Sequence, residues 1–222
     1  EDQDCVGATV CEWLDQEAQP QLVVCDMSPL RLYRQWIEIQ AAPLLEKRKV
    51  PLIQVDAHNV VPVWFASPKR EVGARTLRPK IHKLMSKFFT DYPTDDVLDF
   101  EQPTGAIKDT DLPSFDKKSY LKYLKMDPSV PTVAWAEPGT KSGMKQFDFF
   151  VNNGLKKFDE LRNDPNYGKT ILSNMSPWLN HGHVSFQRLA RIVKSLNKHA
   201  NGTAAYIEEG LVRRELSDNY CY

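Results

Sequence analysis

Small polar side chains crowd one short stretch of the chain, SNMSPWLNHG at residues 173–182. Ser176 followed by Pro177 is typical of a helix start, because the hydroxyl can cap the first turn and proline is tolerated there. Ser173 and Asn174 add hydrogen-bonding groups just before it. The free backbone amides of a helix N-terminus are satisfied by capping side chains or by a bound anion such as phosphate. From the residues alone, both interpretations stay open.

A carboxylate and a guanidinium are spaced four residues apart near the end of the chain. Glu209 and Arg213 fall in a predicted helix that starts near Thr203 and still runs at Tyr222. Residues at this spacing share one helix face. An exposed ion pair worth a few tenths of a kcal/mol is one explanation of the pattern.

Metal chemistry is not supported by the spacing of histidines and cysteines. His181 and His183 form one close pair, but no Cys, Asp or Glu partner stands at a metal-ligand spacing, so we expect no metal. The four cysteines show no C-x-x-C motif and no regular framework. Reduced thiols in an intracellular protein, in the cytoplasm, the nucleus or an organelle, are the expectation.

The composition excludes several classes of protein. The 222 residues carry 29 basic and 29 acidic side chains, so no global field points to nucleic acid or to a membrane surface. No apolar run approaches the roughly 20 residues that span a bilayer. The first residues lack a secretory signal and an initiator Met, and the last helix has no terminating residue. We therefore expect a chain truncated at both ends.

Residues 21–56 predict a strand–helix–strand unit. QLVVCD at 21–26 and VPLIQVD at 50–56 are short β-branched runs, and Ser28-Pro29 predicts the start of the helix between them. Such a unit implies parallel pairing and hence an α/β domain, which we place at residues 1–90. No G-x-G-x-x-G lies between the strands, so a dinucleotide site of that type is not supported.

Residues 91–143 are rich in Pro, Asp and Ser and predict an interdomain connector with one short helix around residues 119–125. Opposite charges are segregated next to it. Residues 69–87 hold seven Lys or Arg against one Glu, and residues 91–101 hold five acids. A solvated face is the ordinary explanation, and a local basic surface is the alternative.

Residues 144–222 predict a helical domain. Apolar residues from Phe147 to Leu161 follow one helical stripe that ends at Asn163-Asp164-Pro165. A second helix is predicted from Ser185, and the third is the one that carries Glu209. The predicted architecture is thus a partial parallel, Rossmann-like α/β domain, a long connector, and the start of an all-helical domain.

Four stretches resemble class II cyclobutane pyrimidine dimer photolyases, of the photolyase/cryptochrome superfamily. Residues 50–81 include V-D-A-H-N-V-V-P, residues 130–139 read VPTVAWAEPG, and residues 172–190 read LSNMSPWLNHGHVSFQRLA. Residues 204–222 include V-R-R-E-L-S-D-N. The resemblance is collinear over most of residues 22–222. It implies a monomeric FAD enzyme for light-driven DNA repair that takes linked pyrimidines out of damaged duplex DNA. The sequence does not identify the antenna chromophore, if the enzyme has one.

The resemblance also assigns roles to residues. Ser173, Asn174, Met175 and Ser176 would hold the phosphate and ribitol region of FAD, which favours the anion interpretation of this stretch. Glu209 matches the acid that meets the dimer's base edges and is the expected catalytic and DNA-binding residue.

The remaining assignments on the last helix are Arg213, near flavin or DNA phosphate, with Glu215 and Asn219 as weaker candidates. Three positions depart from the family pattern: Phe158 stands where tyrosine is usual, Asn180 alters the L-H-F-G loop, and Gly210 replaces leucine. Glycine there weakens the helix by roughly 1 kcal/mol.

Two other functions remain open at this point. One is a cryptochrome-like blue-light photoreceptor, which repair of a dimer-containing oligonucleotide would distinguish. The other is a non-catalytic flavin-binding module, for which a stop codon directly after Tyr222 would be the evidence.

Overall fold

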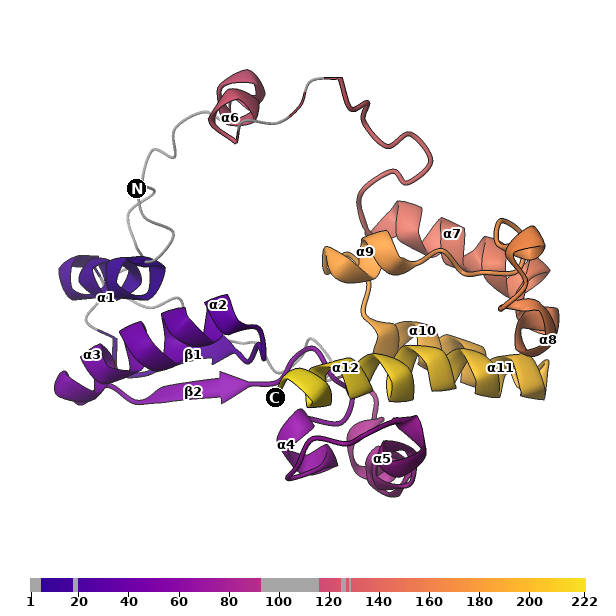
Figure 1. Cartoon of the computed structure of the whole chain (residues 1–222), viewed down its shortest axis with the longest axis horizontal. Coiled ribbons are helices and arrows are strands. Elements are labelled where there is room, and N and C mark those ends of the chain that lie inside the picture. Colours follow the sequence, from indigo (N-terminus) through magenta and orange to yellow (C-terminus); the bar gives the residue numbers. More distant parts are fainter. Residues whose placement is uncertain (1–4, 18–19, 93–115, 125–126, 128) are drawn as a thin grey trace. The chain divides into compact units, whose positions relative to one another are not determined.

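The structure is a computed structural model that describes residues 5–17, 20–92, 116–124, 127 and 129–222 (Figure 1). It divides into two compact units: Glu1–Asp91 together with Pro138–Tyr222, and Tyr92–Glu137. The second unit contains α6 (Lys117–Tyr123), which confirms the short helix predicted in the connector. The acidic stretch 93–101 lies outside the described residues. The boundaries predicted at residues 90 and 143 stay a prediction.

The predicted strand–helix–strand unit is confirmed. Strands β1 (Val23–Asp26) and β2 (Leu52–Val55) pair in parallel with Val23 opposite Leu52. Helix α1 (Val6–Glu17) precedes them. The described residues are therefore helix-rich, with one small parallel sheet.

The helix between the strands begins later than predicted. It runs through α2 (Arg31–Arg34), a π-helical segment (Gln35–Ala41) and α3 (Ala42–Lys47). Leu30 is at its cap without a side-chain bond, and the Ser28 hydroxyl accepts only from the Leu30 amide, at 3.4 Å. The prediction that Ser28-Pro29 starts this helix is therefore wrong by two residues.

After β2 the chain forms α4 (Val63–Ala66) and α5 (Ala74–Phe88). Asp56, directly after β2, organises the turn between β2 and α4. Its carboxylate accepts from the backbone amides of His58, Asn59 and Val63 at 2.8–3.1 Å. A single side chain thus satisfies the amides of a loop that leaves the sheet.

Residues 144–222 contain no strand, as predicted, and all of them are described. The helices of this region are α7 (Thr140–Asn153), α8 (Phe158–Leu161), α9 (Ser176–Asn180), α10 (Phe186–Ser195), α11 (Ala200–Ile207) and α12 (Arg214–Cys221). A π-helical segment, Glu208–Arg213, joins α11 to α12, so the last helical stretch is continuous. Short 3-10 turns occupy Leu155–Lys157 and Pro165–Tyr167.

The first of these helices is interrupted where a single helix is predicted. α7 ends at Gly154, and a Cβ at that position would lie 2.7 Å from the Ile171 carbonyl oxygen. The close approach of two backbones at this glycine accounts for the break. The apolar stripe still forms the core, because Phe147, Phe150, Leu155 and Phe158 are buried on both sides of it.

Candidate functional site

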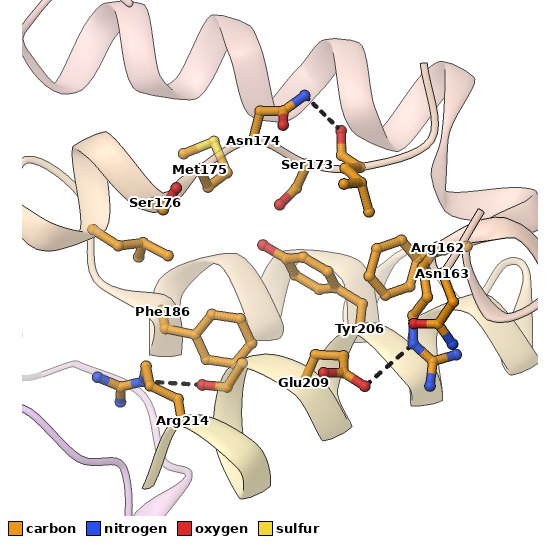
Figure 2. Close-up of a pocket in the computed structure, with 14 residues that line it drawn as sticks. Arg162, Asn163, Ser173, Asn174, Met175, Ser176, Phe186, Tyr206, Glu209 and Arg214 are labelled. Carbon is orange, nitrogen blue, oxygen red and sulfur yellow. Dashed lines mark hydrogen bonds and ion pairs between the residues drawn. The ribbon is translucent and has the colours of Figure 1, made fainter. Parts of the chain in front are cut away.

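A pocket of about 450 Å³ lies among these helices (Figure 2). Its size is ordinary for a small-molecule site. The 172–176 segment faces Glu209 and Gly210 of the last helical stretch across it. The lining residues are Phe158, Arg162, Asn163, Leu172, Ser173, Asn174, Met175, Ser176, Leu179, Phe186, Tyr206, Glu209, Gly210 and Arg214.

The 173–176 segment is held by hydrogen bonds and by a turn with a left-handed residue. Asn174 adopts a left-handed conformation (φ 53°), and its amide donates to the carbonyls of Gly168 and Leu172 at 3.3 and 3.4 Å. Gln146 donates to the Ser173 carbonyl at 3.1 Å, and Met175 is buried. The Ser173 hydroxyl points into the pocket, and Ser176 is also part of its lining.

The predicted capping role of Ser176 is wrong. Met175 occupies the cap position, and Ser176 and Pro177 are the first two residues of α9, whose cap makes no side-chain bond. α9 has only five residues, so few peptide dipoles add up along its axis. Any anion here would depend mainly on individual hydroxyl and amide donors.

Glu209 lies between two arginines. Its Oε1 is 3.2 Å from Nε of Arg162 and 3.2 Å from Nε of Arg213. Its side chain is 34% exposed and lines the pocket. The charge of the carboxylate is balanced by two guanidinium groups. Arg162 also donates to the Asp159 carbonyl at 3.0 Å, which fixes its position. Sequence reasoning missed Arg162, although it follows the stripe of apolar residues directly.

Arg213 and its neighbour Arg214 lie differently relative to the pocket. The side chain of Arg213 is 52% exposed and is absent from the pocket lining, whereas Arg214 lines the pocket. Arg214 donates to the carbonyls of Gly210 and His58 at 3.0 and 2.6 Å. Arg213 is the last residue of the π-helical segment Glu208–Arg213, and Arg214 follows it directly. Glu209 is therefore one turn from both arginines.

Gly210 leaves room for an aromatic ring. A Cβ at this position would lie 1.8 Å from Cε2 of Phe186 and 2.0 Å from its Cζ. The ring of Phe186 therefore lies directly on the helix backbone where any side chain would clash. The departure at Gly210 thus has a packing reason that sequence reasoning did not identify.

Tyr206 stands at the centre of an aromatic cluster beside the pocket. Its ring centroid is 4.9 Å from Phe150, 5.7 Å from Phe158 and 5.4 Å from Phe186. Burial raises the pKa of its hydroxyl, and the nearby Ser173 hydroxyl opposes that shift in part. Within the part of the chain that the structure describes, no hydrogen bond of ordinary geometry satisfies this hydroxyl. An unpaired buried polar group costs about 1–3 kcal/mol, so its presence needs an explanation.

The chain is similar in sequence to several known proteins. Each of three proteins named deoxyribodipyrimidine photo-lyase aligns with 90% of the chain. The identity is 39% over 201 residues for Potorous tridactylus, 37% over 212 for Arabidopsis thaliana and 32% over 206 for Methanothermobacter thermautotrophicus. The chain is therefore similar to these photo-lyases over most of its length. It spans only 36–41% of their length. No family model matches it.

Two of the stretches that carry the resemblance contact each other in the structure: V-D-A-H-N-V-V-P and V-R-R-E-L-S-D-N. Glu215 is buried, and its Oε1 accepts from the amides of Val60 at 2.5 Å and Val61 at 3.4 Å. Asn219 is also buried; it accepts from the amide of Glu71 at 2.7 Å and donates to the Lys69 carbonyl at 3.1 Å. These two candidates thus bind the backbone of residues 60–71, away from the pocket lining.

Burial dominates the titration of Glu215. It raises the pKa of this carboxyl to about 7, and the two amides and Arg214 lower it only in part. Its Oε2 has no hydrogen-bond partner among the described residues. Glu71, by contrast, has its pKa lowered to about 2, first by the bond from Lys80 and then by the Ser67 hydroxyl. Two buried acids of one region therefore favour opposite protonation states.

The basic stretch 69–87 spans the turn before α5 and most of that helix. Arg78 is paired with Glu208 at 2.6 Å, and Lys80 is paired with Glu71. The other basic residues of the stretch are exposed: Lys69, Arg70, Arg75, Lys83 and Lys87. A local excess of positive charge thus remains on this surface despite the neutral total.

Neither a metal centre nor a membrane helix is present in the part of the chain that the structure describes. The rings of His181 and His183 are 6.2 Å apart, and no group of three or more His, Cys, Asp or Glu could hold an ion there. No described helix is both long and apolar enough to cross a bilayer.

Proposed function

We propose that the full-length protein containing this chain is a class II photolyase that splits cyclobutane pyrimidine dimers in DNA under light. The observation that carries the proposal is the convergence of the 173–176 segment and Glu209 on one pocket. These are the residues to which the resemblance assigns the cofactor and the dimer. The contact of V-D-A-H-N-V-V-P with V-R-R-E-L-S-D-N, through Glu215 and the Val60 amide, supports the class II assignment.

The pocket has the donor groups that FAD requires. Hydroxyls of Ser173 and Ser176 and the guanidinium groups of Arg162 and Arg214 can donate to phosphate or ribitol oxygens. Phe158, Leu172 and Leu179 offer apolar surface beside them. The lining has two arginines against one glutamate, so an anionic ligand is favoured. The unpaired Tyr206 hydroxyl is a further sign that the site is built for a polar ligand.

The chain's own residues would bind and orient the two ligands. Reduced FAD, when bound and excited, supplies the electron that splits the cyclobutane ring. Ser173, Asn174, Met175 and Ser176 would hold the phosphate and ribitol side of the cofactor. Glu209 presents a carboxylate whose partners are long arginine side chains, so it can exchange one of them for a base edge of the dimer.

The exposed basic residues of α5 fit a DNA-binding role. Contacts from Lys and Arg to phosphates release counterions, so affinity falls steeply with salt. A binding constant for dimer-containing duplex that stayed flat between low and moderate salt would contradict this part of the proposal. Arg213 is exposed and remains a candidate for a flavin or DNA phosphate.

The function is tested by repair. The full-length protein should bind FAD and restore a thymine-dimer oligonucleotide under blue light, with no repair in the dark. FAD binding without repair would favour the photoreceptor or the flavin-binding module. Absence of FAD binding would contradict the assignment of the pocket itself.

A further inference from the structure

The Tyr206 hydroxyl is a polar group in surroundings that would suit phenylalanine. The residue is buried, and aromatic rings surround it: Phe147, Phe150, Phe158 and Phe186, with centroids 4.9–6.0 Å away. Phenylalanine would keep all these contacts without an unpaired hydroxyl. Packing alone therefore does not explain why this buried position carries a hydroxyl.

The direction of the hydroxyl indicates its role. Figure 2 shows the ring rising from α11 toward the 173–176 segment, with its oxygen near the hydroxyl of Ser173. The Tyr206 oxygen itself is sealed from solvent, so a ligand can reach it only through a neighbour. Ser173 lines the pocket and can accept one hydrogen bond while donating another.

We propose that Tyr206 is a positioning residue, which donates to Ser173 Oγ when the cofactor binds and so directs the Ser173 proton to an oxygen acceptor of the cofactor. This inference rests on the proposed FAD function. Because burial disfavours the phenolate, the tyrosine remains a donor at neutral pH. Without a partner, the Ser173 hydroxyl could rotate its proton toward several acceptors. A hydrogen bond from Tyr206 to Ser173 Oγ would restrict the Ser173 O–H to the direction of the cofactor.

The test compares FAD binding with stability in the absence of FAD. Full-length wild type, Tyr206→Phe, Ser173→Ala and the double variant are freed of flavin and titrated with FAD, and their melting temperatures are measured before FAD is added. Without FAD, Tyr206→Phe should melt at or above the wild-type temperature, because in the cofactor-free protein no described residue forms a hydrogen bond of ordinary geometry with the lost hydroxyl. Its dissociation constant for FAD should rise about tenfold, the effect of one hydrogen bond.

The double variant decides whether Tyr206 acts through Ser173. Its affinity should equal that of Ser173→Ala, because Tyr206 then has nothing left to position. Tyr167→Phe is the matched control; it removes a hydroxyl from an exposed ring and should leave FAD affinity unchanged.

Three results would overturn the inference. Wild-type affinity in Tyr206→Phe would remove the positioning role and leave the proposed function standing. A lower melting temperature of flavin-free Tyr206→Phe would make the hydroxyl structural. If wild type itself does not bind FAD, the proposed function fails and this inference fails with it.

Discussion

Glu209 and Glu215 lie on one continuous helical stretch, yet their surroundings give them different roles. Glu209 faces a pocket and is bound by two arginine side chains at 3.2 Å. Glu215 is 2% exposed and is bound by the backbone amides of Val60 and Val61. Side-chain partners can turn to a ligand, whereas backbone amides of a packed loop cannot. The pocket end of the stretch is therefore suited to binding, and the other end to holding the fold.

The largest expected difference is in stability. Glu215→Ala leaves the amides of Val60 and Val61 without an acceptor, and we expect a loss of about 2–4 kcal/mol in the free energy of unfolding. Glu209→Ala removes partly exposed ion pairs and should cost less than about 1 kcal/mol. Urea denaturation at pH 6 measures both. Equal losses of stability in the two variants would contradict the distinction between the Glu209 end and the Glu215 end of the helical stretch.

The pH dependence of stability is the second expected effect. A carboxyl group whose pKa is raised from 4.5 to about 7 favours folding when protonated. Between pH 4.5 and about 7 the unfolded chain has lost this proton and the folded chain keeps it, so stability falls as pH rises. The slope from this one group is at most about 1.4 kcal/mol per pH unit.

Glu215→Gln isolates that contribution. Glutamine keeps an acceptor oxygen for the Val60 amide but does not titrate, so the slope between pH 4.5 and 7 should disappear. Below pH 4.5 both proteins should lose stability, because Glu71 has a pKa lowered to about 2 and is stabilised by Lys80 only when charged. A variant whose profile runs parallel to the wild type would contradict the role of Glu215.

Gly210 lies between the two acids and provides the third test. Gly210→Leu would place side-chain atoms in the ring of Phe186, and we expect a cost of about 1–3 kcal/mol from overpacking. Combining it with Phe186→Ala should recover most of that loss, because the alanine vacates the space. Thermal unfolding of the two single variants and the double variant measures the coupling. Additive losses would show that the ring and the glycine are independent.

The difference between the surroundings of Glu209 and Glu215 also shows what could be predicted from the sequence. The parallel pairing of 21–26 with 50–56 and the helical character of 144–222 follow from apolar periodicity, which is local. The convergence of the 173–176 segment with Glu209 was expected only from the resemblance. The contacts of Glu215 and Asn219 join residues about 150 positions apart, and no local pattern encodes them.

Two features of the pocket have local physical causes that sequence patterns did not contain. Arg214 lines the pocket beside the π-helical segment, and no pattern in the sequence distinguished it from Arg213. Tyr206 resembles any core aromatic in the sequence, because only the absence of a partner for its hydroxyl distinguishes it. The signal that could have drawn attention to Arg162 is its place directly before Asn163-Asp164-Pro165, at the end of a helix that faces the last one.

Glu209→Gln has the smallest expected effect on stability and the sharpest effect on function. Glutamine keeps the shape and one acceptor oxygen, but the two arginines lose their charged partner, at a cost well under 1 kcal/mol.

Glu208→Gln is the matched control, because Glu208 is the adjacent acid and pairs with Arg78 away from the pocket lining. If Glu209 holds the dimer, its variant should keep normal FAD content while the repair yield per absorbed photon falls, and the control should repair as wild type does. Loss of flavin in Glu209→Gln would assign the carboxylate to the cofactor instead of the dimer. Unchanged yield and unchanged affinity for dimer-containing DNA would leave Glu209 as a bridge between Arg162 and Arg213, and the pocket end of the helix would then differ from the Glu215 end in exposure alone.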